Sequence, residues 1–405
     1  MRFTGKQNKP ETQVKLIIEN WLRMVDVQVG WIPDFDKIIT KYTKHFKLLK
    51  ILQGHNGTIK SVRFSVDSRK IISSSGDQTT RIWDVESGQQ IQIFEGHSDQ
   101  VNAAELSPDG HMVVSCSLDN IVRLWDVESG KELMKLQGHL KSIWDVNFSP
   151  NSKNIVSGSS DKTIRLWDVK SGKEIQKLVG HLGGVMSVKF SSDGQMIVSS
   201  SNDNTIAVWN VKSGKRLKQL IGHSASVTRA KFSPDSRFVV SCSNDKTVRI
   251  WDVTSGKEFK KLGECLSIVS EVTYFPDGQT IASCSLDKTI RLWDVKAKQK
   301  TQVFKVSSGW MTGIDVSPDG NTIAACSSDK TIRIWRFIEF NFNKLLPFFS
   351  KTCYPIKQIV PLLVQQHTIL SFFCSYWLEN FCISLYCLFF KINNFAQRKA
   401  LNKEN

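Results

Sequence analysis

The sequence predicts an all-β fold made of seven similar units, and three observations carry this prediction. Tryptophan recurs every 42 residues, an aspartate precedes each of these tryptophans by six residues, and each unit contains several strand-like runs. A fixed period of this size is typical of repeat architectures, in which each unit buries its faces only against its neighbours. The recurring tryptophans are Trp83, Trp125, Trp167, Trp209, Trp251, Trp293 and Trp335.

Each unit is expected to form four short antiparallel strands. In one unit the runs "SIWDVNFS", "NIVSGS", "TIRLWDV" and "EIQKL" are separated by "SPNSK", "SDK" and "KSGK", whose residues favour turns. The third strand places Thr163, Arg165 and Trp167 on one face and Ile164 and Leu166 on the other. Bulk on both faces predicts a sheet sandwiched between neighbours, as in the blades of a β-propeller.

A Gly-His pair precedes the tryptophan by about 28 residues in the first five units. These pairs end at His55, His97, His139, His181 and His223. With the Trp-Asp pairs, this pattern resembles the WD40 repeat family and extends over about 290 of the 405 residues. The resemblance implies a seven-bladed β-propeller of four-stranded antiparallel blades.

The resemblance also implies how the ring closes. In this family the sequence before the first Gly-His supplies the outermost strand of the last blade. Here "FKLLKILQGH" at 46–55 resembles "KELMKLQGH" at 131–139, so residues 46–52 are expected to complete the blade begun by residues 310–336. The predicted organisation is a flank at 1–45, the propeller at 46–337 and an extension at 338–405.

The polar residues of the repeat are interpreted as structural. The resemblance implies a hydrogen-bonded tetrad of His imidazole, Ser hydroxyl, turn Asp and Trp indole, and buried polar groups need such partners. The five expected tetrads are His55, Ser73, Asp77 and Trp83; His97, Ser115, Asp119 and Trp125; His139, Ser157, Asp161 and Trp167; His181, Ser199, Asp203 and Trp209; and His223, Ser241, Asp245 and Trp251. The sixth unit departs with Cys265 in place of His, and the seventh departs with Ser307 and Ala325.

The competing interpretation, a Ser-His-Asp hydrolase, fails because a catalytic site is one accessible constellation and this set occurs five times. We therefore expect no catalytic residue. We also expect no cofactor and no metal site, because the nine cysteines lack metal-type spacing.

Four cysteines share one repeat position with Gly158 and Ser200, which indicates a site for small residues; they are Cys116, Cys242, Cys284 and Cys326. We expect them to be buried, reduced thiols. The N-terminal stretch "MRFTGKQNKPETQ" has no apolar run, so no secretory signal is predicted. These features favour an intracellular, cytoplasmic location.

Partner binding is expected on the face formed by the loops before the first strand and between the second and third strands, because the resemblance implies that this face most often docks partners. Its large apolar residues are Leu118, Trp144, Met186, Ile268, Leu286 and Trp310. They are either local packing into the central channel or binding hot spots. Trp144 and Met186, on adjacent blades, form the strongest pair.

Charge is distributed unevenly around the expected ring. Residues 84–132 hold 2 basic and 10 acidic residues, whereas residues 212–261 hold 12 basic and 4 acidic residues. The basic stretch is either a solvated rim or a surface that steers an acidic partner, RNA or anionic lipid. Nucleic acid is the less favoured partner, since no aromatic interleaving or nucleic-acid motif accompanies the lysines.

The two flanks differ from the repeats. Residues 11–30 have apolar residues at helical spacing, so a helical segment is predicted that either packs against the propeller or mediates assembly. Residues 368–390 are long and apolar enough to span a bilayer, but Glu379 brings the insertion free energy near zero. For the irregular or helical tail three interpretations remain open: a membrane anchor, a poorly ordered extension, or a translated intron.

Together these features predict a non-catalytic scaffold or adaptor that binds proteins or peptides through one propeller face. Two alternatives remain: an adaptor tethered to a membrane by residues 368–390, and a binder of polyanions through residues 212–261.

Overall fold

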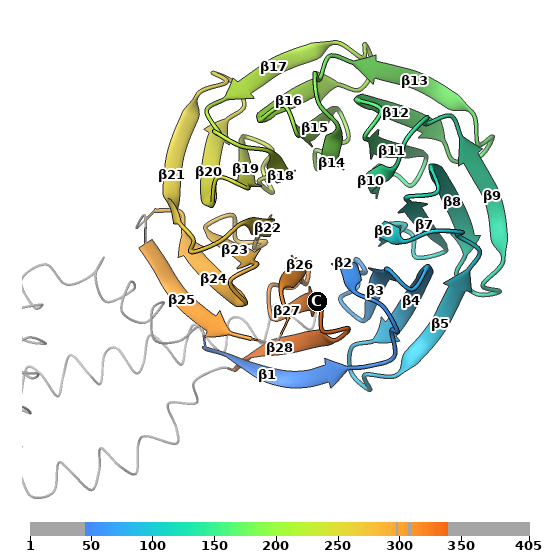
Figure 1. The fold of residues 1–405 in the computed structure, drawn as a ribbon, viewed down its shortest axis with the longest axis horizontal. Helices are drawn as coiled ribbons and strands as arrows, with labels where there is room; N and C mark the ends of the chain where they lie inside the picture. Colours follow the sequence, from blue (N-terminus) through green and yellow to red (C-terminus); the bar gives the residue numbers. More distant parts are fainter. Residues whose placement is uncertain (1–44, 297–298, 307–308, 339–405) are drawn as a thin grey trace, which may run out of the picture. The chain divides into compact units, whose positions relative to one another are not determined.

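Seven four-stranded antiparallel sheets form a closed ring in the computed structural model, which describes residues 45–296, 299–306 and 309–338 (Figure 1). The prediction of an all-β, seven-bladed propeller is confirmed. The strands begin at His45 and end at Ile338, one residue outside the predicted limits at each end. The predicted helical segment and the apolar tail lie outside the described residues, as does Ser307.

The four strands of a blade run from the centre of the ring to its rim. The innermost strands are β2 (Ile59–Phe64), β6 (Val101–Leu106), β10 (Ile143–Phe148), β14 (Val185–Phe190), β18 (Val227–Phe232), β22 (Val269–Tyr274) and β26 (Met311–Val316). The second strands are β3 (Lys70–Ser75), β7 (Met112–Ser117), β11 (Asn154–Ser159), β15 (Met196–Ser201), β19 (Phe238–Ser243), β23 (Thr280–Ser285) and β27 (Thr322–Ser327).

The outer half of each blade carries the tryptophan. The third strands are β4 (Thr79–Asp84), β8 (Ile121–Asp126), β12 (Thr163–Asp168), β16 (Thr205–Asn210), β20 (Thr247–Asp252), β24 (Thr289–Asp294) and β28 (Ile332–Ile338). The outermost strands are β5 (Gln90–Glu95), β9 (Glu132–Gln137), β13 (Glu174–Val179), β17 (Arg216–Ile221), β21 (Glu258–Glu264), β25 (Gln299–Lys305) and β1 (His45–Leu52).

The ring closes through the first strand of the described chain. β1 pairs antiparallel with β28, in a register that sets Phe46 opposite Phe337 and Leu52 opposite Ile332 (Figure 1). Phe46 is buried and packs against Phe275 of the neighbouring blade at 5.9 Å between ring centroids. The first and last strands thus share one sheet, and their apolar contacts join them to the next blade.

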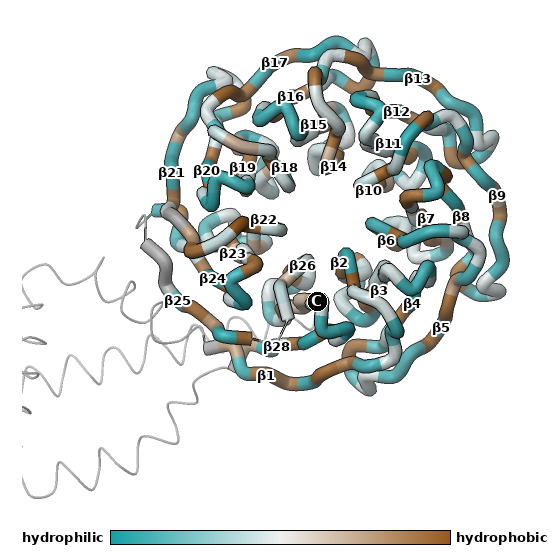
Figure 2. Tube along the Cα trace, viewed as in Figure 1, coloured by the Kyte–Doolittle hydropathy of each residue, from teal (hydrophilic) through white to brown (hydrophobic). Residues whose placement is uncertain are grey.

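Burial is deepest in the middle of each blade and lowest at the rim. The second strands are buried along nearly their whole length, because both of their faces meet neighbouring blades. Outermost strands such as β13 bury little beyond one leucine, Leu178, and mix hydrophilic with hydrophobic residues along the rim (Figure 2).

The small-residue position faces the next blade. A Cβ atom on Gly158 would lie 2.8 Å from a methyl carbon of Val185 on the adjacent blade, so any larger residue here would require Val185 to shift. The four predicted cysteines at this position are buried and free, and burial raises the pKa of Cys242 and Cys326 to about 12. Such thiols are poor nucleophiles at neutral pH.

No helix in the described part of the chain is long and apolar enough to cross a bilayer. Residues 368–390, for which a membrane anchor was one of three open interpretations, lie outside that part.

Candidate functional site

The five predicted tetrads are present with nearly the same geometry in blades one to five. The His Nδ1 atom lies 2.7–2.9 Å from the Asp carboxylate, and the His Nε2 atom lies 2.7–2.8 Å from the Ser Oγ atom. The Trp indole N–H donates to the same Ser Oγ at 2.8–2.9 Å. Each tetrad therefore joins the loop before a blade to that blade's second and third strands.

The serines of the tetrads are the least accessible of the predicted site residues. Each lies on the second strand of its blade and has 0% of its surface exposed; they are Ser73, Ser115, Ser157, Ser199 and Ser241. Each hydroxyl is also shared between a histidine and a tryptophan of its own repeat. None of the five can contact a partner or a substrate, so their part in the site is confined to holding the blade together.

The tryptophan fixes the direction of one hydrogen bond in each tetrad, because an indole N–H can only donate. In blade three, Ser157 Oγ accepts from the Trp167 indole, and it also lies 2.8 Å from Nε2 of His139, whose Nδ1 lies 2.8 Å from Asp161. This arrangement resembles a hydrolytic triad, but the serine is enclosed and its oxygen is already an acceptor. A substrate has no access to it, and the network is structural.

The turn aspartates are held in their charged form. Burial disfavours ionisation of Asp161, but hydrogen bonds from His139 and Thr163 outweigh it and bring the pKa well below its usual range. The equivalent groups lower the pKa of Asp245 to about 2. The Gly of the Gly-His pair serves the same network, since a Cβ on Gly180 would lie 3.0 Å from the Trp209 ring.

Blades six and seven hold the turn aspartate with an arginine instead. Arg291 Nη2 lies 2.6 Å from Asp287 Oδ2, and Arg333 Nη2 lies 3.0 Å from Asp329 Oδ2. The equivalent distances in blades one, two and five are 3.6–3.8 Å. Where histidine is absent, the arginine of the third strand thus approaches the carboxylate directly.

The outermost strand explains why the arginine is available. In blades two, three and five it pairs outward with a glutamate, as Arg165 does with Glu174. The residue opposite the tryptophan in that strand is Lys300 in blade six and Leu48 in blade seven. Neither residue type can accept a hydrogen bond from a guanidinium group. The arginine of the third strand is therefore free to pair with the turn aspartate.

We call the face that carries the tetrad loops the top face. Of the six predicted partner-binding residues, Trp310 is exposed, at 59%, and the others are partly buried: Leu118, Trp144, Met186, Ile268 and Leu286. The indole N–H of Trp144 donates to Ser160 Oγ at 2.6 Å, which fixes the ring to its own blade. The roles of the six residues as channel packing or as binding hot spots stay predictions.

In four other blades, the repeat position of Trp144 forms a hydrogen bond to the next blade. Five residues beyond the Gly-His position, Asn102, Thr228, Ser270 and Thr312 donate to a backbone carbonyl of the next blade's innermost strand, at 2.7 Å in each case. In blades three and four the same position holds Trp144 and Met186. Blades three and four thus have an apolar residue at this position, whereas blade one has Lys60.

Two strongly exposed leucines of the top face were missed. Leu140 and Leu182 follow the histidines of blades three and four and are 78% and 82% exposed. The same position holds Asn56, Ser98 and Ser224 in the other histidine blades. Reading that position along the repeat would have found the two leucines.

The apolar top patch is defined here as Leu140, Trp144, Leu182 and Met186. Its two blades meet closely, since a Cβ on Gly184 would lie 3.1 Å from Ser160. Leu266 of blade six is also 82% exposed, but it lies two blades away from Leu182. Exposed leucines on adjacent blades therefore occur at this position in blades three and four.

The sequence reasoning also missed a charge network inside the ring. Arg63 of β2 reaches Glu271 of β22 at 3.6 Å and Asp145 of β10 at 4.0 Å, although these strands belong to blades that are not neighbours (Figure 1). Lys189 of β14 lies 3.2 Å from Glu105 of β6. These side chains fill the channel that the innermost strands surround.

The same network satisfies the inner edges of the sheets, which otherwise present unpaired N–H groups. The backbone N–H groups of Phe64 and Phe148 donate to Asp315 and Glu105 at 2.9 Å. That of Val188 donates to Asp145 at 3.1 Å. A charged residue within an otherwise apolar predicted strand was the available signal for this network.

The basic stretch 212–261 does not form one continuous surface. Arg229 and Lys231 belong to the channel network, whereas Lys212, Lys215 and Lys257 are exposed at the turns before the outermost strands. Within the described residues, no group of three His, Cys, Asp or Glu side chains is placed to hold a metal ion.

Comparisons with known proteins agree with this architecture. Family models match residues 46–84 ("WD domain, G-beta repeat"), 100–230 ("WDR90, 4th beta-propeller") and 184–352 ("IFT122 first beta-propeller"). Pre-mRNA-processing factor 17 of Saccharomyces cerevisiae is 43% identical over 44 residues, which is 11% of this chain and 10% of that protein.

The guanine nucleotide-binding protein G(I)/G(S)/G(T) subunit beta-1 of Homarus americanus is 51% identical over 39 residues, which is 10% of this chain and 11% of that protein. The matches thus span about a tenth of the length of these curated relatives, roughly one repeat. The family matches, the seven blades and the repeated tetrads together show that the chain belongs to the WD40-repeat family.

Proposed function

We propose that this chain is a non-catalytic scaffold that binds a partner protein through the apolar top patch. Proteins built from WD40 propellers generally act as protein-interaction scaffolds and are typically not enzymes. The observation that carries the proposal is the exposure of Leu140 and Leu182, which flank Trp144 and Met186 on adjacent blades. Exposed leucines on two adjacent blades, one of which also holds the indole of Trp144 fixed by Ser160, are suited to be a binding hot spot.

The structure offers a matched test. Leu140→Ser with Leu182→Ser introduces the residue that Ser98 and Ser224 already place at this position, so the fold is expected to be unaffected. Proteins captured from a cell extract by the full chain should be lost with this double variant. The control is Ile175→Ser with Leu217→Ser, which removes exposed apolar residues, 52% and 48% exposed, from the outer rim.

Capture that is equal for the top-patch variant and the wild type would contradict the proposal. Capture that falls equally for both double variants would show that general surface hydrophobicity, and not the top face, is responsible.

The intracellular location and the membrane tether stay predictions of the sequence. Cell fractionation of the chain with and without residues 338–405 tests both, because only a tethered adaptor would leave the membrane fraction when the tail is removed.

A further inference from the structure

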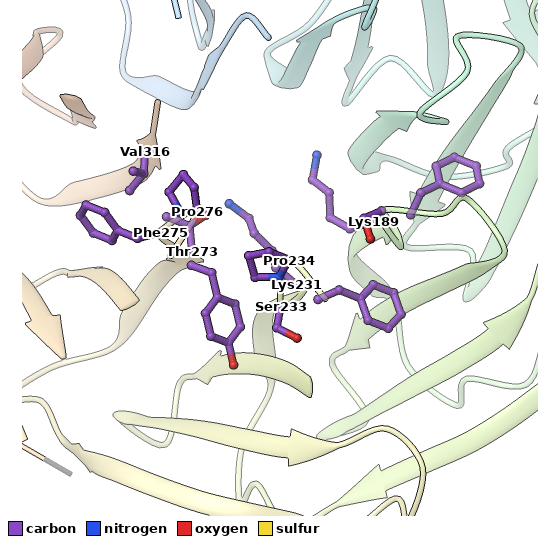
Figure 3. Close-up of a pocket in the computed structure, with 12 residues that line it drawn as sticks. Lys189, Lys231, Ser233, Pro234, Thr273, Phe275, Pro276 and Val316 are labelled. Atoms are coloured by element: carbon purple, nitrogen blue, oxygen red, sulfur yellow. The ribbon is translucent and has the colours of Figure 1, made fainter. Parts of the chain in front are cut away.

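A hollow of about 300 Å³ opens on the face opposite the top patch, where the innermost strands of blades four, five and six end (Figure 3). Departures from the repeat shape it. Ser192 stands where most blades have a proline, and Phe275 stands where the other blades have a serine. Since the repeat positions maintain the fold, residues that depart from them together at one cavity indicate a specific use of that cavity.

Two lysines supply the polar part of the hollow. The ammonium groups of Lys189 and Lys231 point the same way, toward the central channel (Figure 3). Lys189 lies 3.2 Å from Glu105, and Lys231 lies 3.0 Å from Glu271. An ammonium group has three donors, so these contacts leave each lysine able to donate to a further acceptor.

The channel beside the hollow is lined by four cations and four carboxylates: Arg63, Lys189, Arg229 and Lys231 with Glu105, Asp145, Glu271 and Asp315. Arg63, Arg229 and Lys231 all converge on the single carboxylate of Glu271. Among the described residues, both terminal nitrogens of Arg63 are buried without a hydrogen-bond acceptor. Burial, followed by the nearby Arg63 charge, lowers the pKa of Lys231. A ligand carboxylate that enters the hollow could accept hydrogen bonds from the remaining donors of Lys189 and Lys231.

The rim of the hollow favours a single carboxylate over a dense polyanion. Pro234 and Pro276 are exposed and give it apolar edges. Asp193 and Asp235 lie in the adjoining turns, and hydrogen bonds from serines help to lower the pKa of each, so they remain charged and repel a run of phosphates. The exposed Lys212, Lys215 and Lys257 on the same face add long-range attraction for an acidic segment.

We propose that this hollow binds a partner peptide whose aspartate or glutamate side chain reaches Lys189 and Lys231 while its apolar neighbours rest on the two prolines. The site is separate from the apolar top patch, so the propeller would hold two partners on opposite faces.

The test begins with a display library of random decapeptides, selected on the full chain and counter-selected on Lys189→Gln. We expect the peptides that depend on Lys189 to share one acidic residue flanked by apolar residues. The binding of a selected peptide, measured by fluorescence anisotropy, should weaken at least ~10-fold when its acidic residue is replaced by the matching amide, because a hydrogen bond to a charged partner is lost.

Ser192→Pro is the decisive variant, because it narrows the hollow and keeps both lysines. Proline occupies the equivalent position at Pro108, Pro150 and Pro234, so the variant should fold, with a Tm lowered only by the loss of the two exposed hydrogen bonds from Ser192 to Ser236. We expect it to weaken the peptide by a similar factor. Leu140→Ser with Leu182→Ser should leave this binding unchanged, so the two sites are tested independently.

Two outcomes would overturn the proposal. One is a selection that yields no acidic, Lys189-dependent peptides. The other is a result in which Ser192→Pro changes neither the affinity for the selected peptides nor the binding of poly(U) RNA or phosphatidylserine vesicles. Such a result would mean that the peptides bind to a diffuse basic surface and not to the hollow.

Discussion

Blades one to five and blades six and seven hold the turn aspartate with different residues. In the first group a histidine joins the turn aspartate to a buried serine and, through it, to the tryptophan. In the second group an arginine neutralises the aspartate, at 2.6 and 3.0 Å, but does not extend the network to the serine position. A blade of this propeller can therefore lack the repeat histidine and still keep its turn ordered.

The difference should be largest when the aspartate loses its charge. Asp287→Asn leaves Arg291 buried beside a neutral group, which should cost about 3–5 kcal/mol of unfolding free energy. Asp161→Asn disturbs the hydrogen bond to His139 and should cost about 1–3 kcal/mol. Urea unfolding of both variants measures the two costs. Equal losses would mean that the arginine does not depend on its aspartate.

Local opening should follow the same division. Each missing tetrad removes a network worth about 1–3 kcal/mol, so amide hydrogen exchange is expected to be fastest in blades six and seven. The arginine pairs hold the turns, which should confine the effect to the loops that precede these blades. Exchange measured by mass spectrometry resolves it, and uniform protection around the ring would refute the prediction.

Acidification should lower the stability of a blade that has the repeat histidine in a pH range where the stability of blade six, which lacks it, is unchanged. Burial lowers the pKa of His223 below its unfolded value of about 6.5, so the folded protein favours the neutral ring. Its contribution to stability is complete above pH ~6.5 and is lost as the pH falls toward the folded pKa. Asp245, with a pKa of about 2, keeps its contribution until far lower pH.

Unfolding midpoints in urea between about pH 5 and pH 7.5 measure this slope. His223→Gln should be less stable than the wild type at the upper end of this range and show a shallower loss on acidification. An unchanged slope in this variant would assign the titration to another group.

The smallest effect should come from giving blade six the histidine and the glutamate that blades such as blade three have. Cys265→His alone is expected to add little to the free energy of unfolding, because Arg291 already pairs with the carboxylate of Asp287. Adding Lys300→Glu places a carboxylate opposite Trp293, as Glu174 is opposite Trp167. The double variant should gain about 0.5–1 kcal/mol beyond the sum of the two single changes, as a double-mutant cycle would show.

The sequence predicted the blades and the tetrads because their geometry is set within one repeat. The partners of a tetrad, such as His139, Ser157 and Trp167, lie within 28 residues of each other and recur at constant spacing. The partly buried state of Trp144 was harder to predict, because it depends on a hydrogen bond to Ser160 for which the other blades have no tryptophan.

The sequence by itself determined the seven blades, the closing strand and the residues that join each blade together. The reason is that features common to all repeats recur at a constant spacing and can be recognised from that spacing. Only the tertiary structure decided what the repeats do not share. Arg63, Asp145 and Glu271 are separated by 82 and 126 residues along the chain, and they meet because the ring closes around one axis. The charged channel and the hollow beside it follow from that closure, because each combines single residues from several blades.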